Sequence, residues 1–428
     1  MVQFSPFNGW RFDLSQVGSL ADVVCPMPDH IDESTQRSLY RRHPCNVVRL
    51  VANRAEPGDV SASERRLRAA DFFHTWRREG ILLHEHEDSC YVCEFSEGAQ
   101  NEQESQWGVI LRMRLPATPA PVAEVSVTRE HQLLMEQLDA NITPVVAVVR
   151  EEEAAADQLT HLLQRMVPGI TPVQLIDDAG CSARIWPVTD RAACQELLQF
   201  LSDRSVAVVG GQPVFEAACQ WRDQIQQQHT EQGTTFSDND PRRFVMTLVT
   251  GSRDPGLELR PSAAVLSDEA DGLHCRLEEH LQLQQVGSDA GAFDDAVALA
   301  ELHDVQPARA VGFPDGTWWI GCPRSEATSA ISADPWQNLL QSFPKTVWSN
   351  VDRRTVHSLL SDSSVSAVIV TPPSLVLRAP VERESGASEA AQTVTIESAS
   401  IRIPVSVCGI VFAGCHEFSG RAGRRQSL

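Results

Sequence analysis

The residues that could do chemistry begin with a pair of glycines between a predicted strand and a predicted helix. The apolar run Ala207-Val208-Val209 ends at Gly210-Gly211, and a helix-compatible run from Phe215 to Gln226 follows. A helix that starts after a tight turn offers free amide groups and the positive end of its dipole, which attract anions. The spacing therefore predicts an anion-binding turn. The turn itself holds no Ser, Thr, Lys, Arg or His, and Pro213 removes one amide donor.

A second group of reactive side chains is the run His84-Glu85-His86 followed by Cys90. On an extended strand these His and Cys side chains share one face, but zinc ligands must meet at about 2.0–2.3 Å from one point. A continuous strand spreads them too far apart. A polar turn that leads into a half-buried strand explains the run without a metal, so we predict no metal site.

The elements that must position these groups alternate between short strands and helices. Apolar periodicity and turn residues delimit them. The predicted strands are 46–51, 89–95, 107–115, 143–150, 183–188, 207–209, 244–250 and 365–371, with a hairpin at 312–321 and a strand pair or bent strand over 401–412. The predicted helices are 61–80, 129–138, 151–166, 189–201, 215–226, 268–285, 293–303 and 352–361. This alternation predicts a mixed α/β or α+β fold with an interleaved mixed sheet and flanking helices.

The length of the chain and a proline-rich connector predict several subdomains. The chain has 428 residues, and a stiff connector, Pro116 to Pro121, interrupts it early. We expect an N-terminal α+β subdomain over 1–115, a central α/β subdomain over 122–265 and a C-terminal α+β subdomain over 266–418. The basic residues 419–428 are predicted to be a disordered tail.

Composition narrows the possible partners and the compartment. The net charge of -21 argues against nucleic acid and membrane surfaces, which are both anionic. The 11 scattered cysteines are an odd number in a long chain, which favours reduced thiols over a disulfide framework. The first residues form no basic and apolar leader, so we expect a cytoplasmic protein. Lys345 is the single lysine, so any mechanism that needs a lysine, such as a Schiff base, must use it.

Several short segments follow one another along the chain, among them Pro6-Phe7-Asn8-Gly9-Trp10-Arg11-Phe12, Asn46-Val47-Val48-Arg49-Leu50, Glu56-Pro57-Gly58-Asp59, Ala140-Asn141-Ile142-Thr143-Pro144 and Asp254-Pro255-Gly256-Leu257. In this order, along nearly the whole chain, they resemble the family named domain of unknown function 1015. At the glycine turn the family pattern is similar to a charged loop of ParB-like and free serine kinase proteins, which implies a ParB-like core and phosphate chemistry.

The charged residues of that family pattern are absent here. In the family's I-A-D-G-H-H-R-Y-E-T-A stretch the aspartate falls on Gly210, the histidines on Gln212 and Pro213, and the arginine on Val214. Gly211 and Glu216 keep their identity. The resemblance therefore implies a retained fold without the proton carriers and fixed cations of the family.

Two hypotheses follow, and neither requires a cofactor. In the first, the chain is a catalytically silent homologue that binds or scaffolds, with a small anionic metabolite as its ligand. In the second, it is a kinase-like or phosphotransfer enzyme for a small phosphorylated or carboxylated metabolite, with a rearranged site. A partner subunit for an intact relative is a third, weaker idea. The candidate ligand-binding residues are Asp29, Asn46, Arg49, Gly210, Gly211 and Glu216.

Overall fold

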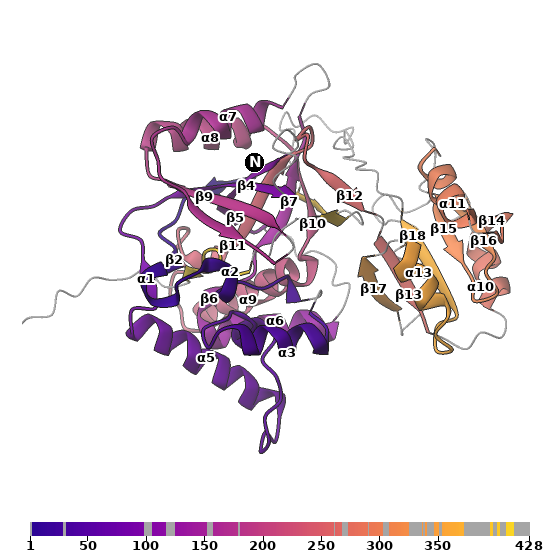
Figure 1. Ribbon diagram of the computed structural model, residues 1–428, viewed down its shortest axis with the longest axis horizontal. Helices are drawn as coiled ribbons and strands as arrows, with labels where there is room; N and C mark the ends of the chain where they lie inside the picture. The colour runs from indigo at the N-terminus through magenta and orange to yellow at the C-terminus, as the bar shows by residue number, and fades with distance from the viewer. Residues whose placement is uncertain are drawn as a thin grey trace, which may run out of the picture. The chain divides into compact units, whose positions relative to one another are not determined.

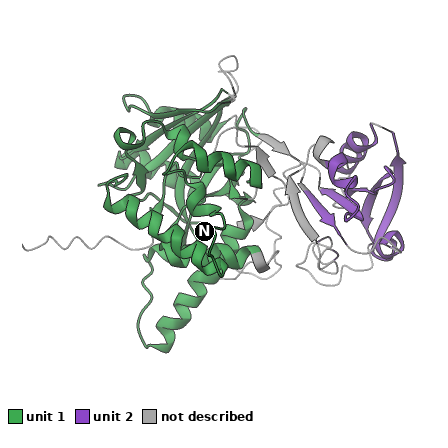
Figure 2. Cartoon of the chain, turned by 60° about the horizontal axis from the view of Figure 1, so that its bottom comes forward, with its two compact units in different colours: residues 1–257, 377–396, 403–428 green, residues 258–376, 397–402 purple. Residues whose placement is uncertain are grey.

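The computed structural model forms two compact units (Figures 1 and 2). Residues 1–257, 377–396 and 403–428 make the first unit, and residues 258–376 and 397–402 make the second. The structure describes residues 2–28, 31–97, 105–116, 125–151, 157–178, 180–260, 262–267, 273–289, 291–302, 308–324, 336, 339, 346–350, 353–371, 394–396, 400–402 and 408–414. No helix in these ranges is long and apolar enough to span a bilayer.

The first unit is built on a nine-stranded sheet in the order β19-β10-β7-β11-β5-β4-β9-β8, with β1 beside β5. Two of its pairs, β10 with β19 and β7 with β11, are parallel, and the others are antiparallel. The predicted mixed sheet and α+β class are thereby confirmed. The strands are β1 (Phe4–Ser5), β4 (Cys90–Glu97), β5 (Gln106–Arg114), β7 (Val145–Val149), β8 (Val173–Ile176), β9 (Cys181–Val188), β10 (Val206–Gly210), β11 (Phe244–Gly251) and β19 (Val394–Ile396).

Helices cover both faces of this sheet, because its central strands are apolar on both sides (Figure 1). Along β11, Met246 and Leu248 pack with the N-terminal helices, whereas Val245 and Val249 belong to the cluster of α7 and α8. The helices are α1 (Leu14–Val17), α2 (Leu20–Val23), α3 (Glu33–Arg42), α4 (Val48–Val51), α5 (Ala62–Arg78), α6 (Val125–Leu138), α7 (Gln158–Met166), α8 (Arg191–Ser202) and α9 (Gln212–Glu231), with the short η3 (Pro241–Arg243). Short pairs β2 (Trp10–Phe12) with β3 (Leu82–His84) and β6 (Ala140–Asn141) with β21 (Ala413–Gly414) complete the unit.

The second unit has a fully antiparallel six-stranded sheet in the order β14-β16-β15-β18-β13-β17. Alternate residues of β13 face two separate apolar clusters, so both faces of this sheet are covered as well. Its elements are β13 (Ser262–Leu266), α10 (Leu273–His280), β14 (Leu281–Gly287), α11 (Ala292–Glu301), β15 (Arg309–Gly312), β16 (Trp318–Pro323), β17 (Thr346–Asn350), α13 (Arg353–Leu360) and β18 (Ala367–Thr371), with the pair β12 (Glu258–Arg260) and β20 (Ser400–Arg402).

One predicted strand is wrong. Residues 46–51 form the helical turn α4 instead, although valines favour strands. The side-chain oxygen of Asn46 accepts the amide of Val48 at 3.0 Å, which starts a turn. The amide of Val47 donates to Val23 O at 2.7 Å and anchors this turn to α2. A local side-chain hydrogen bond has overridden strand propensity.

A second prediction is wrong in its C-terminal half. The predicted helix 268–285 contains α10, but the chain changes to strand at Leu281, where β14 pairs with β16. Most other predicted helices and strands in the described ranges occur within a few residues of their expected bounds, but the helix predicted over 151–166 begins only at Gln158. Within 401–412, the described residues belong to β20, which pairs with β12, and to isolated bridges of Cys408 and Phe412 with N-terminal residues. The expected segments 1–115 and 122–265 supply adjacent strands, β5 and β11, of one sheet, and the three-part division stays a prediction. The tail 419–428 lies outside the described residues.

Candidate glycine turn and neighbouring cleft

The glycine turn has the predicted strand-turn-helix geometry. Gly210 ends β10, and Gly211 is the N-cap of α9 with a left-handed φ of 70°. A Cβ atom at Gly211 would lie 3.3 Å from both Pro144 O and Val145 Cα, and 3.4 Å from Met27 Cε. Conformation and close packing against β7 thus both require glycine here. These requirements exist without any bound anion.

Two neutral side chains donate hydrogen bonds to one buried carboxylate near the start of α9. Glu216 is 2% exposed, and its oxygens accept hydrogen bonds of 3.0 Å from Gln212 Nε2 and from Thr128 Oγ1 of α6. Pro213 stands in the first turn and has no amide hydrogen. An anion placed at this helix end would therefore meet a carboxylate and find one amide fewer than usual.

Two other predicted site residues hold the backbone of the N-terminal region. Asn46 is fully buried, and its amide group donates to Asp22 O at 2.7 Å and Val24 O at 3.0 Å. The guanidinium of Arg49 lies 4.3 Å above the ring of Tyr40 and donates to Tyr40 O at 3.0 Å. Asp29 lies outside the described residues. The structure gives Arg49 and Glu216 different partners, and it brings Gly210, Gly211 and Glu216 together at the start of α9.

The segment Glu56-Pro57-Gly58-Asp59 is anchored to α5. Asp59 accepts two hydrogen bonds of 2.7 Å from the guanidinium of Arg68, and one of 2.7 Å from the amide of Glu56. These bonds, those from Arg68 above all, lower the pKa of Asp59 from 3.8 to about 2. The fork of Arg68 matches the carboxylate in a bidentate pair. The arrangement fixes the loop in front of α5.

The turn Asp254-Pro255-Gly256 is also structural. Asp254 accepts hydrogen bonds from the amides of Trp107 at 2.8 Å and Gly256 at 2.9 Å, and from Thr160 Oγ1 at 2.9 Å. Burial nevertheless raises the pKa of Asp254 from 3.8 to about 6, because it disfavours the charged form. The carboxyl group links β5, α7 and the end of β11.

His84 and Cys90, from the run considered above as a possible metal site, have different neighbours. The ring of His84 packs on that of Trp10 in a tilted arrangement, with 4.5 Å between the ring centroids. Cys90 is fully buried, and the adjacent thiol of Cys194 and burial raise its pKa. Within the described ranges, no group of three or more His, Cys, Asp or Glu side chains could hold a metal ion.

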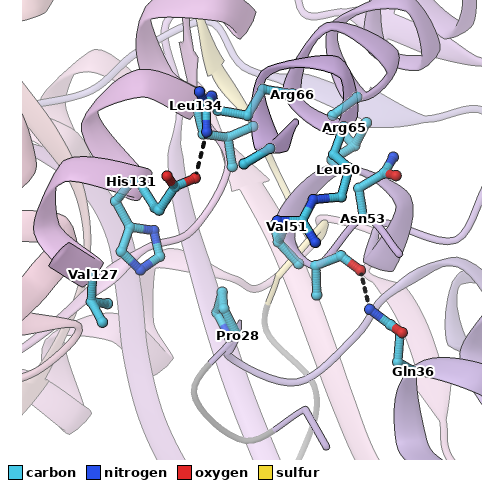
Figure 3. Close-up of a pocket in the computed structure, with 14 residues that line it drawn as sticks. Pro28, Gln36, Leu50, Val51, Asn53, Arg65, Arg66, Val127, His131 and Leu134 are labelled. Atoms are coloured by element: carbon cyan, nitrogen blue, oxygen red, sulfur yellow. Dashed lines mark hydrogen bonds and ion pairs between the residues drawn. The ribbon is translucent and has the colours of Figure 1, made fainter. Parts of the chain in front are cut away.

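A cleft of about 400 Å³ lies between α4, α5 and α6 (Figure 3). His131 and Val127 line one side, and Gln36 and Asn53 line the other, with Pro28 between them. Its charged residues are Arg65, Arg66 and Glu130. Arg66 pairs with Glu130 at 2.6 Å, whereas Arg65 donates no hydrogen bond to any other described residue. The positive charge of Arg65 also helps to lower the pKa of the nearby Asp59.

The cleft and the glycine turn share their supporting segments. Pro28, at the cleft, follows Met27, which packs on Gly211. Val127, also at the cleft, precedes Thr128, which bonds Glu216. Sequence reasoning missed this cleft, because its residues come from helices distant in the sequence. The adjacent pair Arg65-Arg66 did not distinguish the cleft in the sequence, because Arg-Arg pairs also occur at 41–42, 77–78, 242–243, 353–354 and 424–425.

Comparison with known proteins gives a family and no relative of known activity. No curated protein and no solved structure matches the chain. The similarity to ParB-like and free serine kinase proteins stays a prediction. The sequence model described as protein of unknown function (DUF1015) matches residues 4–352, which is most of the 428-residue chain. The chain therefore belongs to the DUF1015 family.

Proposed function

We propose that this chain is a binding protein for a small phosphorylated or carboxylated metabolite, and that it does not turn the ligand over. The ligand site is the cleft between α4, α5 and α6. The observation that carries the proposal is the guanidinium of Arg65, which lines the cleft and makes no hydrogen bond within the described ranges. A guanidinium binds phosphate or carboxylate with two parallel hydrogen bonds.

The charge balance of the cleft supports an anionic ligand. Arg65 and Arg66 contribute two positive charges and Glu130 one negative charge, in a chain whose net charge is -21. A local positive site in an acidic protein selects anions by attraction at short range, since salt screens the distant carboxylates. Gln36, Asn53 and His131 lie beside these charges.

The glycine turn supports the absence of catalysis. Gln212 Nε2 and Thr128 Oγ1 donate to the two oxygens of Glu216, which gives this carboxylate a structural role in holding α6 against α9. The alternative, a phosphotransfer enzyme that uses Asp29, Arg49 and Glu216, requires these side chains to converge. Arg49 instead bonds Tyr40 O.

Thermal shift measurements test the proposal. Inorganic phosphate, pyrophosphate and citrate should raise the Tm of the full chain in a concentration-dependent manner, because a ligand that binds only the folded state stabilises it. Arg65→Gln should abolish the shift. The matched control is Arg37→Gln, which removes an exposed arginine of α3 that pairs with Glu33 and does not line the cleft.

Two results would contradict this function. If Arg65→Gln and wild type respond equally to all three anions, the cleft is not the site. If the purified protein hydrolyses ATP or ADP, and Asp29→Asn or Glu216→Gln abolishes that activity, the enzyme hypothesis replaces the binding hypothesis.

A further inference from the structure

Two cysteines from opposite ends of the sequence form a buried pair. The amide of Cys25 donates to Cys408 O at 3.1 Å, and the amide of Cys408 donates to Cys25 O at 3.2 Å. The two residues form an isolated antiparallel bridge, and both are 0% exposed. Both are free thiols.

The backbone geometry of this pair suits a disulfide. In a hydrogen-bonded antiparallel pair the Cα atoms lie about 5.5 Å apart and the side chains leave the same face. A disulfide spans Cα separations of about 4.4–6.8 Å. The reciprocal backbone hydrogen bonds therefore bring the two thiols within reach of each other, and burial together with the neighbouring Cys408 raises the pKa of Cys25.

We propose that Cys25 and Cys408 are a site of reversible disulfide formation, with a low-molecular-weight disulfide such as oxidised glutathione as the oxidant. One thiolate attacks a glutathione sulfur and releases one glutathione. The second thiol, after losing its proton, attacks the resulting mixed disulfide and releases another. Two protein thiols and one oxidised glutathione thus give one protein disulfide and two glutathione thiols.

The pair lies directly beside the segment that joins the glycine turn to the cleft. Cys408 Sγ is 3.7 Å from Met27 Sδ and 3.9 Å from Thr143 Oγ1. Met27 packs on Gly211, and Pro28 lines the cleft. Oxidation therefore ties the segment 25–28 covalently to the C-terminal part of the first unit, and it closes almost the whole chain into one loop. Such closure stabilises a fold by restricting the unfolded chain.

Burial makes this reaction slow in the native state. An oxidant reaches the pair only when the segment around Cys408 opens locally. The described residues that follow Cys408 pair through the isolated Phe412–Trp10 bridge and through β21, which has 2 residues. The exposed thiol of Cys275 should react first. This difference separates the proposed site from general surface oxidation.

A second pair of neighbouring thiols provides an internal comparison. The thiols of Cys90 and Cys194 are hydrogen-bonded, but Cys194 lies on α8 and its sulfur also bonds Val188 O at 3.4 Å. No reciprocal backbone hydrogen bonds hold these two residues at a fixed separation in the described structure. We therefore expect the Cys25–Cys408 link to form in preference.

The test is oxidation of the full-length protein with oxidised glutathione, followed by blocking of free thiols and peptide mass spectrometry. The expected result is a linked peptide pair that contains Cys25 and Cys408, with a Tm increase that a reductant reverses. Cys25→Ser and Cys408→Ser should each lose both signals, and Cys194→Ser should keep both. The wild-type peptide map is independent of how well the variants fold.

Other peptide maps would overturn the inference. One is a map in which Cys25 and Cys408 stay free, or carry only glutathione, after Cys275 has reacted fully and the protein has been held a few degrees below its Tm. A map with only Cys90–Cys194 linked would do the same. A Tm increase that persists in Cys408→Ser would assign the stabilisation to another bond. None of these outcomes bears on whether anions bind at Arg65.

Discussion

The carboxylate of Glu216 joins two helices at the glycine turn, because it accepts a hydrogen bond of 3.0 Å from Thr128 Oγ1 and another of 3.0 Å from Gln212 Nε2. Thr128 belongs to α6 and Gln212 to the first turn of α9. The contacts of Glu216 indicate that it holds α6 against α9.

Glu216→Gln should therefore destabilise the fold. The new amide group replaces one accepting oxygen by a donor, so one of the two donors that face it loses its acceptor. A buried donor without a partner costs about 1–3 kcal/mol, which urea unfolding can measure. Thr128→Val is the partner variant, and in a double-mutant cycle the two losses should not add. Full additivity would show that the two side chains act independently.

Gly211→Ala should destabilise the protein more than Gly233→Ala does. Both glycines have a left-handed φ, 70° and 65°, so alanine costs about 1–2 kcal/mol at either position. A Cβ atom at Gly233 would have nothing within 4 Å, whereas at Gly211 it would crowd Pro144 O and Val145 Cα at 3.3 Å. The difference between the two free energies of unfolding thus isolates the close packing at the turn. Equal losses would mean that the turn has room for a side chain.

Strands and helices with strong periodicity could be predicted from the sequence, and so could the turn between β10 and α9. Val206–Gly210 is apolar and buried up to its glycine, as expected for a central strand. The segment at Asn46 was predicted wrongly, because a buried asparagine side chain replaced strand pairing by a helical turn. Such a bond is invisible in the sequence until the position of Asp22 and Val24 is known.

The cleft could not be predicted, for a different physical reason. Arg65 and His131 are distant in sequence, and their proximity depends on the packing of α5 against α6. The retained family segments pointed to function, but Asp59 and Asp254 proved to hold backbone turns. A turn can require an aspartate as strictly as a reaction can, so a sequence pattern alone does not separate the two roles.

The Asp59–Arg68 pair should give the fold a defined dependence on acid. Ionic pairing lowers the pKa of Asp59 from 3.8 to about 2, so its stabilising effect is fully present above about pH 4 and is lost as the pH falls toward 2. The Tm difference between wild type and Asp59→Asn should be constant from pH 7 to about pH 4 and then narrow. Arg68→Gln should follow the same course. If the Tm difference between wild type and Asp59→Asn increased in acid, the Asp59–Arg68 pair could not be the source of the pH dependence.

Asp254 should have the opposite effect on stability and stabilise the fold more as the pH falls. Burial raises its pKa in the folded protein from 3.8 to about 6, so the folded state binds this proton more tightly than the unfolded chain does. The contribution of Asp254 to the free energy of unfolding therefore rises as the pH falls from 7 to 4, by about 3 kcal/mol for two pKa units.

Asp254→Asn cannot titrate, so subtracting its free energy of unfolding from that of wild type removes the pH dependence of other groups. The free energy of unfolding of wild type minus that of Asp254→Asn should increase as the pH falls from 7 through 6, and it should become constant below about pH 4. Urea unfolding at one-unit pH intervals measures it. The opposite trend would mean that the hydrogen bonds from Trp107, Thr160 and Gly256 outweigh burial and keep Asp254 ionised.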